Sequence, residues 1–122
     1  MLVTQRNTLS TAAQGAKTAT YKAQSSNIRN KGYIGFKLTV NIKAGATGTV
    51  TPTVSEYDES GNAIKTWSLG AISSGINIIE VYPALTTGGN VYNDILGELY
   101  NATMTISNGG SLTFDAVLDL IP

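Results

Sequence analysis

The chain has 122 residues and a mass of 12.8 kDa, the size of one ordinary domain with a single core. Charged residues make up only 13% of it, the formal net charge is zero, and it contains neither cysteine nor histidine. This composition excludes disulfides, thiolate metal sites and Ser-His or Cys-His catalysis, and its many threonine, serine, asparagine and glycine residues favour strands and turns over helices.

The first 16 residues are polar and show little periodicity, with Gly15 closing the segment. We predict that residues 1–16 form an extended N-terminal arm. Ordering a backbone costs roughly 1–2 kcal/mol per residue, which the few apolar side chains here cannot offset. The arm should therefore be mobile unless a partner orders it, and residues 17–122 should form one domain.

Strand-like alternation begins near Thr18. We predict a first strand over 18–25, a loop over 26–32, and then the clearest strand of the chain over 32–43. In that strand one face is apolar and the other faces water, because every second residue is hydrophobic. The apolar residues are Ile34, Phe36, Leu38, Val40 and Ile42.

Two further strands are predicted on either side of a turn at 58–62. The first, over 49–57, contains Pro52, which lacks an amide donor and so places this strand at a sheet edge or at a bulge. The second follows the turn and directs Trp67, Leu69 and Ala71 inward. Another strand is expected over 76–83, after a turn at 73–75.

The segment 80–97 follows no strand pattern. Pro83 ends the preceding strand, Gly88-Gly89 lets the chain reverse, and 94–99 could hold one helical turn. We interpret the segment as the longer connection that crosses between two sheets, with four apolar residues capping the core; a ligand-binding loop is the alternative. The capping residues are Val91, Tyr92, Ile95 and Leu96.

Two alternating strands complete the chain, over 99–107 and 111–121, with a glycine turn between them. About seven to eight short strands at regular spacing, without a convincing helix, predict an all-β fold. The expected architecture is an antiparallel β-sandwich or jelly roll with an extended N-terminal arm.

The charges are segregated along the sequence: every basic residue lies at or before Lys65, and every acidic residue lies at or after Glu56. In one interpretation, basic and acidic strands are neighbours and the charges largely pair. In the other, the molecule has a positive and a negative end, which would favour head-to-tail packing of copies.

No motif in the sequence indicates an enzyme or a cofactor site. The glutamates Glu56, Glu80 and Glu98 are not paired as acid catalysis requires. The spacing of oxygen-bearing residues over 58–62 resembles a calcium loop weakly and is also ordinary turn chemistry. Trp67 is expected in the core rather than on a sugar-stacking platform, and the neutral net charge argues against nucleic-acid binding.

From Lys31 onward, the order of features resembles small virion proteins of tailed phages. The likeness begins with NKGYIGFKLTVNIKAGATGTVTPTVSEYDESGNAIKTW and continues through IIEVYPALT, DILGELYNATMTI and the final LDLI. The hairpin at Asp58 to Lys65, the strand end at Val81 to Leu85 and the last strand at Ser111 to Ile121 occupy the corresponding places. The likeness covers about three quarters of the chain; the arm has no match, and the residues before Lys65 depart from the family's hairpin.

The resemblance implies a non-enzymatic capsid decoration or capsid-stabilising protein, bound in many copies to the phage head. The implied partners are the major capsid protein, sister subunits or both, with a homo-oligomer on the particle and no nucleic acid or membrane. We expect a virion protein made in the host cytoplasm, because no signal peptide is apparent. The arm and nearby basic residues are the predicted contacts, by strand addition: Leu2, Val3, Arg6, Leu9, Lys17 and Lys22.

Two alternatives remain open. The chain could be a glycan-binding or host-attachment module that uses its tyrosines as a stacking surface. It could also be a tail or connector component that forms a ring through its segregated charges.

Overall fold

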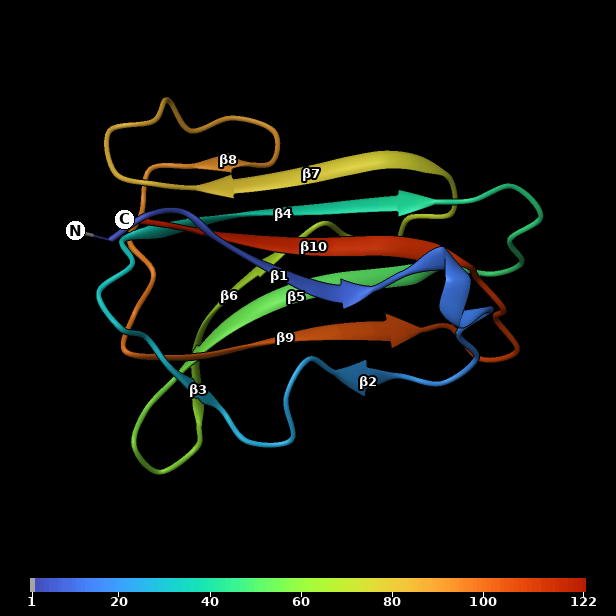
Figure 1. Cartoon of the computed structure of the whole chain (residues 1–122), viewed down its shortest axis with the longest axis horizontal. Helices are drawn as coiled ribbons and strands as arrows, with labels where there is room; N and C mark the ends of the chain where they lie inside the picture. The colour runs from blue at the N-terminus through green and yellow to red at the C-terminus, as the bar shows by residue number, and fades with distance from the viewer. Residues whose placement is uncertain (1) are drawn as a thin grey trace.

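The computed structural model describes residues 2–122 and shows two five-stranded β-sheets stacked face to face (Figure 1). The first sheet has the strand order β1 (Gln5–Ser10), β10 (Phe114–Ile121), β4 (Gly35–Ile42), β7 (Gly75–Val81) and β8 (Val91–Tyr92). The second has the order β2 (Tyr21–Lys22), β9 (Leu99–Ile106), β5 (Val50–Tyr57) and β6 (Ala63–Ser68), with β3 (Ile28–Arg29) also on β9. All pairs are antiparallel except β7 with β8. The predicted β-sandwich is confirmed.

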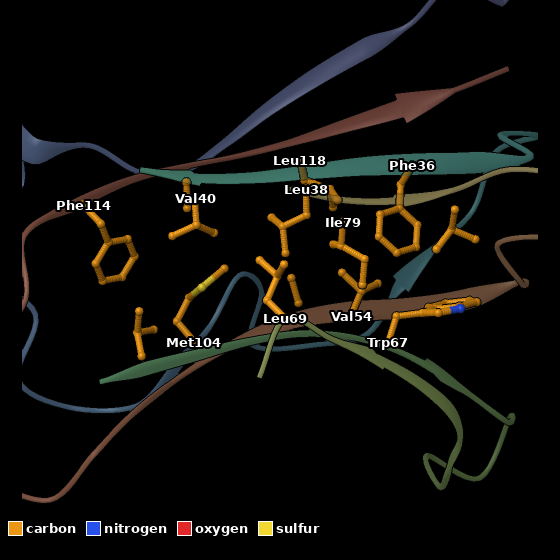
Figure 2. Packing of buried hydrophobic residues seen from close by; sticks show 14 of the residues in the cluster. Phe36, Leu38, Val40, Val54, Trp67, Leu69, Ile79, Met104, Phe114 and Leu118 are labelled. Atoms are coloured by element: carbon orange, nitrogen blue, oxygen red, sulfur yellow. The ribbon is translucent and has the colours of Figure 1, made fainter. Parts of the chain in front are cut away.

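The core lies between the two sheets and follows the predicted alternation, except that Ile34, which was expected inside, precedes β4 and is 38% exposed. Side chains of β4 and β10 from one sheet point toward those of β5 and β9 from the other (Figure 2). Phe36 and Trp67 meet across this space edge to face, with ring centroids 5.2 Å apart. Burying each large apolar side chain fully contributes about 1.5–3 kcal/mol, so this layer is the main source of stability.

The expected edge position of Pro52 is wrong, because β5 lies between β9 and β6. The carbonyl of Pro52 accepts the Leu69 amide at 3.0 Å, so the ring nitrogen faces the same side. On that side β6 has already ended at Ser68, and the next pairing is the Val50–Ile72 bridge. The amide donor that Pro52 lacks therefore falls at a position where β6 no longer pairs with β5. Ala71 was also expected inside and is exposed, since the chain leaves the strand after Leu69.

The segment 80–97 is a connection between sheets, as predicted, since it leads from β7 in the first sheet to β9 in the second. It carries the short strand β8, which pairs with the end of β7. Leu96 is buried and donates its amide to the Ile34 carbonyl, so it caps the core. Ile95 is exposed, and no helical turn forms over 94–99, so these two details of the prediction are wrong.

The N-terminal arm is the main correction to the expected structure. Residues 5–10 form β1, which pairs with β10 from Gln5 opposite Leu120 to Ser10 opposite Ala116. A 3-10 turn, η1 (Ala12–Gln14), follows. The arm was expected to need a partner, but β10 of the same chain supplies the backbone hydrogen bonds that order it. A register shift between Thr8 and Ser10 interrupts its alternation, which conceals the strand in the sequence.

The segregated charges pair across the fold, which confirms the first of the two interpretations. Ion pairs join Arg6 to Asp119, Arg29 to Glu59 and Glu98, Lys43 to Asp115, and Lys65 to Asp94. Within residues 2–122, no helix has the length and hydropathy that a membrane-spanning segment needs.

Candidate functional site

A groove of about 630 Å³ runs between the edges of the two sheets. One wall is β1, the edge strand of the first sheet. The other wall is the segment 23–31, which runs along β9 of the second sheet and contains β3; Figure 1 labels both β1 and β3. We call this the β1 groove. Its floor is apolar and consists of Leu9, Ala23, Ile28, Tyr33, Tyr100, Leu118 and Leu120.

The β1 wall presents an open strand edge to the groove. Backbone groups of a strand alternate between its two sides, and β10 occupies one side of β1. On the other side, no backbone hydrogen bond of residues 2–122 reaches residues 5–10. About half of the amides and carbonyls of β1 therefore face the groove, where they can pair with an added strand.

The opposite wall is held against β9 by a buried asparagine. Asn101 is 1% exposed, and its side-chain amide donates to the Gln24 carbonyl at 2.8 Å. Its side-chain oxygen accepts the Gln24 amide at 3.3 Å and the Ala102 amide at 2.9 Å. Here the side chain replaces a backbone partner, because the segment bulges away between β2 and β3.

Asn30 anchors the far end of the same wall. Its side-chain nitrogen donates to the carbonyls of Tyr33 at 2.7 Å and Gly97 at 3.0 Å, and its oxygen accepts the Tyr33 amide at 2.9 Å. The Tyr33 hydroxyl then reaches across to the Gln5 side chain at 3.0 Å, so the two walls meet at this end of the groove.

The charged side chains that line the groove are all basic: Arg6, Arg29 and Lys31. Arg6 forms a two-pronged contact with Asp119 at 2.8 and 3.0 Å, and this hydrogen bonding lowers the pKa of the Asp119 carboxyl. Arg29 contacts Glu59 and Glu98 outside the groove, whereas Lys31 has no ion pair among the described residues. On the 23–31 side, Lys31 is therefore the groove-lining cation that has no acidic partner among the described residues.

The structure brings two of the six predicted contact residues together in this site. Arg6 and Leu9 line the groove from β1. Leu2 and Val3 precede the strand and are 42% and 68% exposed. The amines of Lys17 and Lys22 lie over tyrosine rings, 5.3 Å from the centre of Tyr21 and 5.8 Å from the centre of Tyr57, and are outside the groove.

Sequence reasoning missed the segment 23–31, which it placed partly in the first strand and partly in a loop. The basic residues Arg29 and Lys31 were a weak signal, since they stand in a polar stretch with few acids nearby in sequence. The groove places this segment opposite β1, which is far from it in the chain, and no local sequence pattern reports that arrangement.

The carboxylates other than that of Glu80 are engaged in structural contacts. Glu56 is buried and accepts the Gly97 amide at 2.7 Å, while Glu98 pairs with Arg29. Asp58 accepts the Ser60 and Asn62 amides at 2.9 Å, and backbone hydrogen bonding, chiefly from Asn62, lowers its pKa. The 58–62 segment is thus a hairpin turn, and residues 2–122 hold no cluster of three or more possible metal ligands of the His, Cys, Asp and Glu types.

The aromatic residues do not form a stacking platform around Trp67. Its side chain is in the core and 4% exposed, as predicted, and Tyr100 is buried as well. The Tyr82 hydroxyl donates to the Pro122 carbonyl at 2.7 Å, which fixes that ring near the C-terminus.

Comparison with known proteins identifies no family: no family model matches the chain, and no curated protein matches it. Solved structures of infectious bursal disease virus share a weak likeness. One chain of the T13 viral particle is 12% identical with a TM-score of 0.40, and the Gt strain structure is 15% identical with a TM-score of 0.40. The alignments cover 95% and 96% of this chain, which spans about a third of the length of those chains (28% and 32%). Likeness at this level transfers neither family nor function.

Proposed function

We propose that this chain is a non-enzymatic structural protein of a virus particle, bound in many copies to the outside of a phage head as a decoration or stabilising protein. The resemblance of residues from Lys31 onward to small tailed-phage virion proteins supports this function. The carboxylates also favour it, because those of Glu56, Asp58 and Glu98 make structural hydrogen bonds rather than a catalytic pair.

The observation that carries the proposal is the free edge of β1 above an apolar, basic-rimmed groove. Such an edge is costly to leave open on a protein that acts alone, because it invites strand pairing with other chains. In a protein that works by assembly, the open strand edge serves as the contact with a partner. Many weak contacts repeated on a shell would then act together through avidity.

A tail or connector ring is the second candidate, because the first sheet has a second open edge. On the side that faces away from β4, the backbone of β7 pairs with β8 only at Glu80 and Val81. The backbone of residues 75–79 is therefore unpaired on that side, and the side chains of Ile76 and Ile78 in this stretch are exposed. Edges at both ends of one sheet suit head-to-tail contact between copies.

Sedimentation separates these functions. The purified protein is centrifuged alone and then with heads of the corresponding phage prepared without it. We expect a monomer or small oligomer that pellets with the heads and saturates them at a fixed stoichiometry. A closed ring that forms without heads would favour the second candidate, and a protein that stays in the supernatant would refute head decoration.

A further inference from the structure

We propose that the β1 groove binds an extended acidic segment of a partner protein, which adds as a strand to β1 and places carboxylates against Arg29 and Lys31. The proposal deepens the suggested virion role and takes from it only the existence of a partner. It names the contact that such a partner makes.

The shape of the groove suits one extended strand. The free edge of β1 has six residues, which corresponds to a span of roughly 20 Å at about 3.3 Å per residue. A strand added there would lie about 4.8 Å from β1, along the apolar floor of the groove. Every second side chain of the added strand would face Leu9 and Ile28, which are partly exposed, and so would be apolar.

The charge of the groove selects an acidic partner. Arg29 and Lys31 line it on the 23–31 side and no carboxylate does, so an acidic segment can pair with Lys31, whereas a basic one meets like charge. Lys31 has no ion pair within residues 2–122, and Arg6 and Arg29 are more than half exposed beside their acidic partners. Lys31 can therefore contact a bound carboxylate directly, and Arg29 can contact one beside its two glutamates.

A second copy of this chain is a poor source of the acidic segment. Every acidic residue of this chain except Glu80 already accepts a hydrogen bond or forms an ion pair. These residues are Glu56, Asp58, Glu59, Asp94, Glu98, Asp115 and Asp119. Glu80 lies on β7, within the first sheet. A segment from a different protein fits the groove without breaking these contacts.

The test uses the whole chain, labelled with ¹⁵N, and two synthetic ten-residue peptides that alternate valine with glutamate or valine with lysine. Amide shifts are followed as peptide is added to about 2 mM, a range in which weak complexes are still observed. We expect shifts concentrated in residues 5–10 and 23–31, and binding of the acidic peptide about tenfold tighter than that of the basic one. Added salt should weaken the acidic complex.

Matched variants locate the binding site. Ser25 and Ser26 are adjacent and exposed, but only Ser26 lines the groove. Ser26→Trp should fill the groove and weaken the acidic peptide about tenfold or more, while Ser25→Trp should leave its affinity unchanged. A second pair guards against misfolding: Lys31→Gln should weaken binding, and Lys37→Gln, on β4 away from the groove, should not.

Several results would overturn the inference. They are an absence of shifts, equal binding of the two peptides, equal losses in the two tryptophan variants, or shifts centred on β7. Concentration-dependent shifts in the groove without peptide would identify a second copy as the occupant and would also refute the choice of partner. Particle binding is measured separately by sedimentation, so either proposal can fail while the other stands.

Discussion

Replacing Asn101 by leucine tests whether one buried amide holds the wall of the β1 groove in place. Leucine has nearly the same size and shape, so the change removes hydrogen bonds with little change in volume. The lost contacts are the three that the Asn101 side chain makes, with Gln24 at 2.8 and 3.3 Å and with the Ala102 amide at 2.9 Å. The segment 23–26 would then lack its anchor on β9.

The expected loss of stability follows from these three bonds. A hydrogen bond within a protein contributes about 0.5–1.5 kcal/mol net, so three contribute roughly 1.5–4.5 kcal/mol. Water can reach the exposed Gln24 in the variant but not the buried Ala102 amide, which puts the expected loss near the middle of that range, at about 3 kcal/mol. With a urea slope of about 1.5 kcal/mol per molar, the unfolding midpoint should fall by about 2 M.

Urea unfolding followed by Trp67 fluorescence measures this midpoint, and Asn77→Leu is the matched control. The Asn77 amide also donates two hydrogen bonds, to the Ser74 and Gly75 carbonyls, but at the exposed start of β7. It should cost less than about 0.5 kcal/mol, because water replaces both bonds. If Asn101→Leu destabilises the protein no more than Asn77→Leu does, the anchor is not where the structure puts it.

Three further predictions concern the N-terminal strand, the acid response and a turn. Deleting residues 2–11 removes β1 and uncovers the edge of β10. We therefore expect a clear drop in the urea unfolding midpoint and binding of a hydrophobic dye. An unchanged midpoint would mean that the segment is an arm that does not pair with β10. The pKa of Asp115 is lowered, chiefly by the Ala12 amide and then by Lys43, and that of Asp119 chiefly by Arg6. The unfolded chain therefore binds protons more readily than the folded one. The stability that the two carboxylates contribute is complete above their ordinary pKa of 3.8 and is lost as the pH falls through their folded-state pKa values. On acidification, amide exchange should show β1 loosening before β4, and simultaneous loosening would contradict this order. Gly48→Ala should lower the free energy of unfolding by more than about 1 kcal/mol, because φ is +75° there and an added Cβ would lie 2.8 Å from the Gly110 Cα. Gly45 also has a positive φ, but an added Cβ there would meet no other atom, so Gly45→Ala should lower it less; thermal unfolding measures both.

The long strands could be predicted because their alternation is complete. In β4 and β10 every second residue is apolar and buried, and the sequence predicted both patterns apart from Ile34, which lies before β4 and is exposed. β1 was missed because it is short and polar, and because the shift between Thr8 and Ser10 interrupts its period. The two-residue strands β2, β3 and β8 are too short to leave any periodic signal.

The site could be predicted only in part, because it is made by contacts that join distant parts of the chain. Arg6 and Leu9 were chosen for their place in the N-terminal segment, and the structure puts them in the groove. Asn101 looked like a solvent-facing strand residue, since its neighbours Tyr100 and Ala102 alternate around it. It is buried because the segment near Gln24 covers it from 77 positions away.

The central claim is that this protein assembles onto a particle through the β1 groove. Hydrogen exchange of the protein, free and pelleted with phage heads that lack it, tests this claim most directly. The structure predicts new protection in residues 5–10 and 23–31 and little change along the open edge of β7. Protection confined to β7, or a protein that pellets with the groove still unprotected, would contradict it.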